Sequence, residues 1–89
     1  MKFEWAANKE RANVEKHGIS FADASTVFGD LLATTIADPD HSQGESRFLT
    51  MGHAVNNQLV VVSHTEEGDT IRIISAREAT SHERKAYES

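Results

Sequence analysis

Two arginines interrupt an otherwise apolar segment, Ile71-Arg72-Ile73-Ile74-Ser75-Ala76-Arg77. A guanidinium within an apolar strand needs an anionic partner, because burying it unpaired is very costly. That partner can be a phosphate or the charge that develops in a transition state. It can equally be a carboxylate such as Glu45 or Glu83, in a structural salt bridge. Strict strand alternation places Arg72 and Arg77 on opposite faces of this segment.

Two further pairs bring acid–base groups together at short spacing. Glu45 and Arg47 share one face of a predicted strand, where they suit a general base with a charge stabiliser or an ordinary exposed pair. Lys16 and His17 precede Gly18 at the end of a predicted helix. Imidazole, with a reference pKa of about 6.5, suits proton transfer at neutral pH. A histidine at this position can also simply cap the last carbonyls of the helix, so both interpretations stay open.

The five histidines do not form a metal-binding motif. They are dispersed, without an H-x-x-x-H or H-E-x-x-H pattern, and the chain has no cysteine. His53 and His64 could face each other across a hairpin, but two ligands do not make a metal site. The isolated glycines form no phosphate-binding loop, and Ser63 and Ser75 have no neighbouring base. We therefore expect chemistry without a metal or another cofactor.

Local signals predict three helices that would position these groups. The first spans residues 8–17 and ends at Gly18, a residue typical of the position after a helix. The second begins at Ser20 as N-cap, and the third runs from Thr80 to about residue 87 with Glu83 as the capping-box partner. The second helix carries an apolar stripe of Phe21, Ala24, Val27, Phe28 and Leu31.

Five segments have the composition of strands, with turn residues between the last four. They cover residues 3–5, 33–37, 45–55, 59–65 and 70–77. Consecutive strands joined by short turns predict a mostly antiparallel sheet with the helices packed on one face of it. The sequence therefore predicts an α+β fold in which two helices precede most of the sheet and one helix follows it.

Length and charge limit the class of protein. The chain has 89 residues and 9.8 kDa, so we expect a single domain over residues 1–89. It has neither an apolar run of about 18 residues nor a secretory signal, so we expect a cytoplasmic protein without a membrane span. The net charge of −5 lacks the basic character of a non-specific nucleic-acid binder. Any nucleic-acid contact must use a local cluster, and an acidic chain also suits a basic protein partner.

Motifs along almost the whole chain resemble the BrnT family of bacterial toxins. They are Phe3-x-Trp5, Lys9, Asn13-x-x-Lys16-His17-Gly18-Ile19-Ser20-Phe21-x-x-Ala24, Val27-Phe28, Asp38-Pro39-Asp40-His41-Ser42, Glu45-x-Arg47, Gly52, Leu59-Val60-Val61-Val62, Ile71-Arg72-Ile73-Ile74-Ser75-Ala76-Arg77, Ala79, Glu83-Arg84 and Tyr87. The resemblance implies a RelE-like fold and a ribonuclease toxin of a type II toxin–antitoxin pair. It also implies a BrnA-like antitoxin with a ribbon-helix-helix part, which would contact operator DNA and repress the operon together with the toxin.

One departure from the family pattern concerns the residue after Trp5. Family members usually carry Asp there, and this chain has Ala6. If that Asp caps the first helix, its loss costs about 0.5–2 kcal/mol. If it takes part in the site, the alternative is a catalytically inactive module that still binds the antitoxin and acts as co-repressor.

In the enzyme interpretation, the 2′-hydroxyl of RNA attacks the adjacent phosphate without a metal, which requires a base, an acid and cations. We expect Arg72 and Arg77 to bind the scissile phosphate, with Arg47 assisting. Either His17 or Glu45 would be the base, and either Lys16 or His17 the acid. The expected RNA-binding residues are Lys9, Trp5 and Arg84. Trp5 has core packing as its competing use, since the chain has only six aromatic residues.

Overall fold

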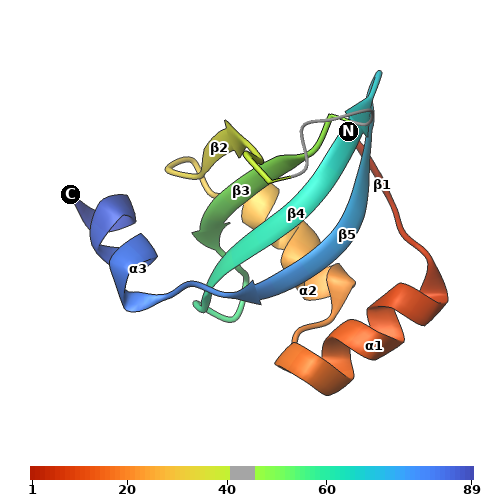
Figure 1. The fold of residues 1–89 in the computed structure, drawn as a ribbon, viewed down its shortest axis with the longest axis horizontal. Coiled ribbons are helices and arrows are strands. Elements are labelled where there is room, and N and C mark those ends of the chain that lie inside the picture. Colours follow the sequence, from red (N-terminus) through yellow and green to blue (C-terminus); the bar gives the residue numbers. More distant parts are fainter. Residues whose placement is uncertain (41–45) are drawn as a thin grey trace.

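The computed structural model describes residues 1–40 and 46–89 (Figure 1). Its elements are β1 (Lys2–Glu4), α1 (Ala7–His17), α2 (Phe21–Ser25), the 3₁₀ helix η1 (Thr26–Gly29), β2 (Thr34–Ala37), β3 (Phe48–His53), β4 (Leu59–Glu67), β5 (Thr70–Glu78) and α3 (Ser81–Glu88). The strands form one sheet in the order β1-β5-β4-β3-β2. All neighbours are antiparallel except β1, which runs parallel to β5. The predicted α+β fold is confirmed.

The main core lies between one face of the sheet and the α2–η1 segment, which runs behind the sheet in Figure 1. Its buried residues are Ile19, Phe21, Ala24, Val27, Ala54, Val60, Val62, Ile71, Ile73 and Ala76. The predicted apolar stripe is confirmed at Phe21, Ala24 and Val27, but it is wrong at Leu31, which is 98% exposed. The α-helical turn ends at Ser25 and tightens into 3₁₀ geometry, so the 3.6-residue period does not reach Leu31.

The opposite face of the sheet, which we call the open face, carries a smaller apolar cluster. Leu59, Val61 and Ala79 are its buried members, and Leu49, Met51 and Tyr87 pack against them. The helix α3 lies over this end of the sheet through Tyr87, but none of its own residues is buried. It is therefore held at a few points rather than embedded in a core. The prediction that the helices pack on one face of the sheet is wrong for α3, which lies on the face opposite α2.

The structure contains the local capping interactions that the predicted helix boundaries require. Gly18 adopts a left-handed conformation with φ of 71° after α1, where a side chain would be strained. The Ser20 hydroxyl accepts a hydrogen bond from the Asp23 N–H at 3.0 Å, as an N-cap does. Thr80 and Glu83 form the predicted capping box at the start of α3.

At Gly52 in β3, η1 and the following turn lie close against the sheet. A Cβ placed there would lie 3.0 Å from Ala33 Cβ, 3.1 Å from Asp30 Oδ2 and 3.1 Å from Val27 Cγ1. Such contacts are tighter than ordinary packing allows, so a larger residue would push the η1 turn away from the sheet.

His64 is fully buried on the face of the sheet that α2 and η1 cover. His64 Nε2 lies 2.7 Å from the Thr50 hydroxyl, and the rings of Phe28 and Phe48 pack against the imidazole. The register pairs His64 with Phe48 and His53 with Leu59, so the two histidines do not face each other across the β3–β4 hairpin. Burial lowers the pKa of His64, because the charged form loses hydration.

The neutral state of His64 predicts a loss of stability in mild acid. Its pKa is lower in the folded than in the unfolded chain, so protons favour unfolding as pH falls through about 6.5. We expect the free energy of unfolding to fall between pH 7 and pH 5, by at most about 1.4 kcal/mol per pH unit. Urea unfolding of His64→Leu should show a flatter pH profile. The exposed-site control His82→Gln should keep the wild-type profile; an unchanged slope in His64→Leu contradicts the assignment.

Candidate functional site

The attachment of α1 to the edge of β5 positions the predicted site. The strand β1 covers this edge only as far as Arg72. Beyond it, the buried Asn13 side chain accepts a hydrogen bond from the Ala76 N–H at 3.0 Å and donates one to the Ala76 carbonyl at 2.9 Å. Its amide also donates to the Ile19 carbonyl at 2.9 Å. The carboxamide thus replaces a neighbouring strand and holds α1 against β5.

This attachment brings three of the predicted site residues into one shallow cleft. Lys9, Lys16 and His17 of α1 line a cleft of about 230 Å³ together with Ile74 and Ser75 of β5. Lys9 and Lys16 lie seven residues apart, two helical turns, and so project from the same side of the helix. Two amines and an imidazole therefore face a strand whose serine hydroxyl lies on the opposite side of the cleft.

A β-bulge in β5 changes which faces of the sheet the two arginines occupy. Ser63 pairs with Ser75 and His64 pairs with Ile73, so Ile74 is an extra residue in β5. Because of this extra residue, Arg72 and Arg77 lie on the same open face, and the prediction of opposite faces is wrong. They flank the cleft at backbone positions about 15 Å apart, given a rise of about 3.3 Å per residue.

Arg72 is the more available of these two guanidiniums. It is 46% exposed and lies 3.7 Å from the Glu4 carboxylate, whose residue is its register partner in β1. An exposed pair at this distance is weak, so a phosphate can replace the carboxylate at little cost. Its predicted partners Glu45 and Glu83 are not the ones found: Glu83 binds Arg77, and Glu45 lies outside the described residues.

Arg77 is already bound to a carboxylate. Its guanidinium donates to both oxygens of Glu83, at 2.7 and 2.9 Å, and this pairing raises its own pKa while lowering that of Glu83 to about 2. Glu83 also accepts a hydrogen bond from the Thr80 N–H at 2.9 Å, so the ion pair is part of the α3 capping box. Glu83, considered from the sequence as a partner of Arg72, thus pairs with Arg77 instead, and the role of Arg77 on phosphate stays a prediction.

Arg47 is the residue before β3, and its carbonyl accepts a hydrogen bond from the Asp38 N–H at 2.9 Å. Continuing the β3–β4 register places it opposite Thr65, whose partner on the other side is Arg72. The backbones of the two arginines are thus two strand spacings apart, about 10 Å. The proposed base Glu45 lies outside the described residues, as does His41.

The remaining predicted RNA-binding residues are not gathered in the cleft. Trp5 is half-buried and packs edge-to-face on Phe21, with ring centroids 6.0 Å apart, next to the main core. Its geometry is that of a core residue, the competing use considered from the sequence. Arg84 lies on α3, away from the residues that line the cleft.

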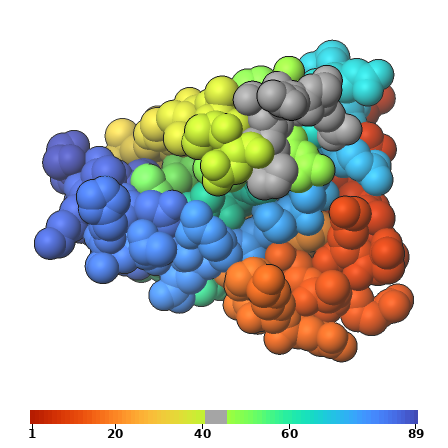
Figure 2. Space-filling model, viewed as in Figure 1, coloured from red at the N-terminus to blue at the C-terminus, as the bar shows by residue number. Residues whose placement is uncertain are grey.

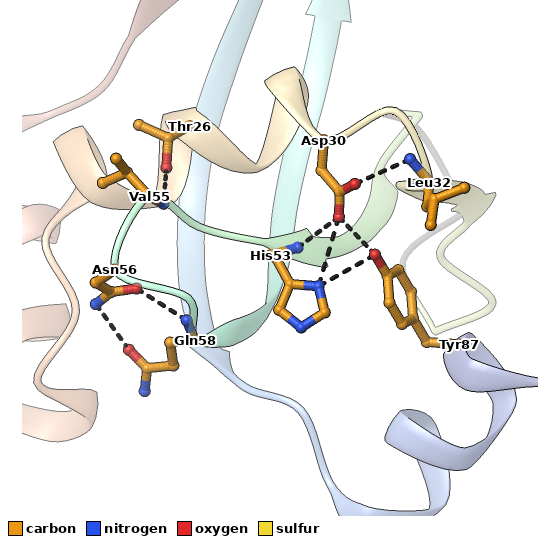
Figure 3. A network of polar contacts seen from close by, with 8 residues as sticks. All are labelled: Thr26, Asp30, Leu32, His53, Val55, Asn56, Gln58 and Tyr87. Carbon is orange, nitrogen blue, oxygen red and sulfur yellow. Dashed lines mark hydrogen bonds and ion pairs between the residues drawn. The ribbon is translucent and has the colours of Figure 1, made fainter.

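A polar cluster that the sequence did not predict connects η1, β3 and α3 (Figure 3). Asp30 Oδ2 accepts hydrogen bonds from the Tyr87 hydroxyl at 2.6 Å and from the His53 N–H at 2.8 Å, and Oδ1 accepts one from the Leu32 N–H at 2.9 Å. These donors lower the pKa of Asp30 to about 2, and the carboxylate in turn raises the pKa of Tyr87. Because 57 residues separate Asp30 from Tyr87, no local spacing indicates this contact.

Neither a metal-binding cluster nor a membrane-spanning helix is found within residues 1–40 and 46–89. Within these ranges, no three His, Cys, Asp or Glu side chains gather as a metal site would require. Among the helices of these same ranges, none has the length and hydrophobicity needed to cross a bilayer.

Comparisons with known proteins first identify the fold. It matches the 1.1 Å crystal structure of the ribonuclease toxin BrnT from Brucella abortus with a TM-score of 0.66, at 24% sequence identity, over 91% of this chain and 99% of that chain. Among curated proteins, none matches the chain. The family model described as ribonuclease toxin, BrnT, of type II toxin–antitoxin systems matches residues 5–83. The chain therefore belongs to the BrnT family of ribonuclease toxins, which implies an antitoxin partner and an RNA substrate.

The N-terminus of α1 supports a first prediction about the site. Ala6 is the N-cap residue, in an extended conformation and without a side-chain hydrogen bond to the first turn. Restoring the family residue with Ala6→Asp should stabilise the protein by about 0.5–2 kcal/mol, measured by urea unfolding. Ala6→Asn should give a similar gain, because asparagine caps as well. No gain from either variant would show that this position does not limit the stability of α1.

The Arg77–Glu83 pair supports a second prediction. Glu83→Gln keeps a capping side chain but removes the charge, and because the pair is partly exposed we expect a loss of about 0.2–1 kcal/mol at pH 7. The stability that Glu83 contributes is present above its unfolded pKa of about 4.5 and is lost as pH falls toward 2. The difference from wild type in urea unfolding should therefore shrink at pH 3. Glu88→Gln on the same helix is the control, and an equal loss there contradicts a specific role of the pair.

Proposed function

We propose that this chain is a metal-independent endoribonuclease and that the α1–β5 cleft is its active site. The observation that carries the proposal is the convergence of Lys9, Lys16 and His17 on Ser75 in a member of a ribonuclease toxin family. This cluster supplies cationic and titratable groups within an otherwise acidic chain, as a local RNA-binding site requires. Arg72, on the open face beside the cleft, supplies a further guanidinium.

The proposed reaction is transesterification with release of the downstream RNA fragment. The 2′-oxygen forms a bond to phosphorus while the bond from phosphorus to the 5′-oxygen breaks, which leaves a 2′,3′-cyclic phosphate and a 5′-hydroxyl. His17 takes the proton of the 2′-hydroxyl, and Lys16 donates a proton to the departing oxygen. Lys9 and Arg72 stabilise the negative charge on the phosphate, with Arg77 and Arg47 acting on the open face.

Neutralisation is proposed to come from a BrnA-like antitoxin that acts in the same cytoplasmic compartment. In this proposal, its ribbon-helix-helix part contacts operator DNA, and the toxin acts as co-repressor through the antitoxin. An acidic toxin is consistent with leaving the DNA contact to the antitoxin, since its net charge of −5 disfavours direct DNA binding.

The second candidate is a catalytically inactive module that keeps only the antitoxin-binding and co-repressor role. The observation that favours it is the pairing of Arg77, which is fully engaged with Glu83 rather than directed to the cleft. Harmless expression without the antitoxin would favour this module, and growth arrest would favour the enzyme.

The test is cleavage of a defined single-stranded RNA by the purified protein in EDTA. Wild type should leave 2′,3′-cyclic phosphate ends. His17→Gln and Lys16→Met should each lower the cleavage rate by about 100-fold or more, as expected for groups that transfer protons. The matched control is Arg11→Gln, because Arg11 is an exposed cation on the same helix that does not line the cleft.

Two variants of the ion pair separate catalysis by Arg77 from its structural role. Arg77→Ala and Glu83→Gln both break the pair, but only the first removes the guanidinium. Loss of cleavage in Arg77→Ala alone places Arg77 on the phosphate, whereas equal activity in both variants removes it from the site. If wild type cleaves neither free RNA nor RNA on added ribosomes, the inactive module is the correct function.

A further inference from the structure

Three hydroxyl side chains lie together on the open face of β4 and β5. Side chains alternate along β4, so Ser63 and Thr65 share the face of Val61. The register pairs Ser63 with Ser75 of β5. All three are half-buried, and within residues 1–40 and 46–89 no side-chain or backbone group is hydrogen-bonded to their hydroxyls. These hydroxyls are therefore available to a ligand.

Two guanidiniums flank these hydroxyls. Thr65 pairs with Arg72 on one side, and the continued β3–β4 register places Arg47 on its other side. Arg72 has only the weak contact with Glu4 at 3.7 Å, and the half-buried Arg47 has no carboxylate partner in the described part of the chain. Side chains opposite each other on neighbouring strands lie about 4.5–5.5 Å apart at Cβ. One anion above Thr65 can therefore contact both arginines.

The β-bulge at Ile74 is what brings the hydroxyls and Arg72 to the same face. With strict alternation from Ser75, Arg72 would lie on the face that carries the main core. The extra residue in β5 shifts this alternation, so Arg72 and Ser75 both lie on the open face. Bulges commonly redirect a side chain beside a functional site.

The acidic side chains on this part of the open face leave room for an anion. Glu4 and Glu83 are each paired with one of the two arginines of β5. The acidic residue on the same face of β4 is Glu67, which lies two residues beyond Thr65, about 7 Å along the strand. An anion is therefore most stable on the Ser63 side of Thr65, away from Glu67.

Ser75 connects this group of hydroxyls with the candidate active site. It lines the α1–β5 cleft together with Lys16 and His17, and it pairs with Ser63. In Figure 2, which shows the open face, α1 (orange) lies beside β5 (blue). Thr65 is the diagonal neighbour of Ser75, at about 7–8 Å. This distance is close to the spacing of successive phosphates in an extended single strand.

We propose that Ser63 and Thr65, between Arg47 and Arg72, form a second phosphate subsite, which binds the RNA phosphate next to the one cleaved in the α1–β5 cleft. This inference rests on the proposed function for the RNA substrate and for the place of cleavage. The two hydroxyls donate hydrogen bonds to the non-bridging oxygens, and the two guanidiniums neutralise their charge. Such contacts set the position of the strand and do not read its sequence.

The first test measures binding of a non-cleavable single-stranded RNA, a 2′-O-methyl octamer, so that its result does not depend on catalysis. Ser63→Ala and Thr65→Val should each weaken binding by about 10-fold, as expected when a hydrogen bond to a charged group is lost. The matched control is Thr34→Val, because Thr34 is an exposed strand hydroxyl that lies outside the subsite. Urea unfolding of each variant verifies that it is folded.

The second test measures how octamer binding depends on salt. For single strands, the logarithm of the binding constant falls with the logarithm of the salt concentration by about 0.7 per neutralised phosphate. Arg47→Gln should therefore reduce this slope by about 0.7. Arg11→Gln, which removes an exposed cation outside the subsite, should keep the wild-type slope. A purely structural role of Arg47 would leave the slope unchanged.

No octamer binding by wild type, unchanged affinity in both hydroxyl variants, or an unchanged slope in Arg47→Gln overturns the proposal. Weaker antitoxin binding in these variants with full octamer binding assigns the surface to the protein partner instead. Cleavage in EDTA separates this proposal from the proposed function. If wild type is inactive but the effects on octamer binding hold, the catalysis fails and the subsite stands. If wild type cleaves RNA but both hydroxyl variants bind the octamer normally, only the subsite fails.

Discussion

The carboxamide of Asn13 is the interaction on which the arrangement of the site depends. It binds both backbone groups of Ala76 and the carbonyl of Ile19, so one side chain connects α1, β5 and the start of the α2 segment. The backbone groups of Ala76 are buried, and leaving them unpaired would cost about 1–3 kcal/mol each. Lys16 and His17 reach β5 only because this connection holds α1 beside the strand.

The candidate cleft and the strand β2 lie far apart on one sheet. The α1–β5 cleft lies at one end of the strand order, and β2 lies at the other. Arg77 lies on the open face, and its ion-pair partner Glu83 belongs to α3.

What the sequence could predict depends on whether the signal is local. The caps at Gly18, Ser20 and Thr80 follow from neighbouring residues and were confirmed. The bulge at Ile74 depends on how β4 pairs with β5, so simple alternation gave the wrong face for one arginine. The bond from Asp30 to Tyr87 joins distant parts of the chain, and no pattern in one sequence indicates it.

The placement of α3 has a consequence for the opening motions of the molecule. Since α3 contributes no buried residue and is fixed by an ion pair at its start and by Tyr87 near its end, it forms its own cooperative unit of low local stability. Opening of this unit costs only a fraction of global unfolding and leaves the main core intact. It uncovers Leu59 and Val61, so a minor state of the native ensemble exposes the apolar part of the open face without any change in the strands.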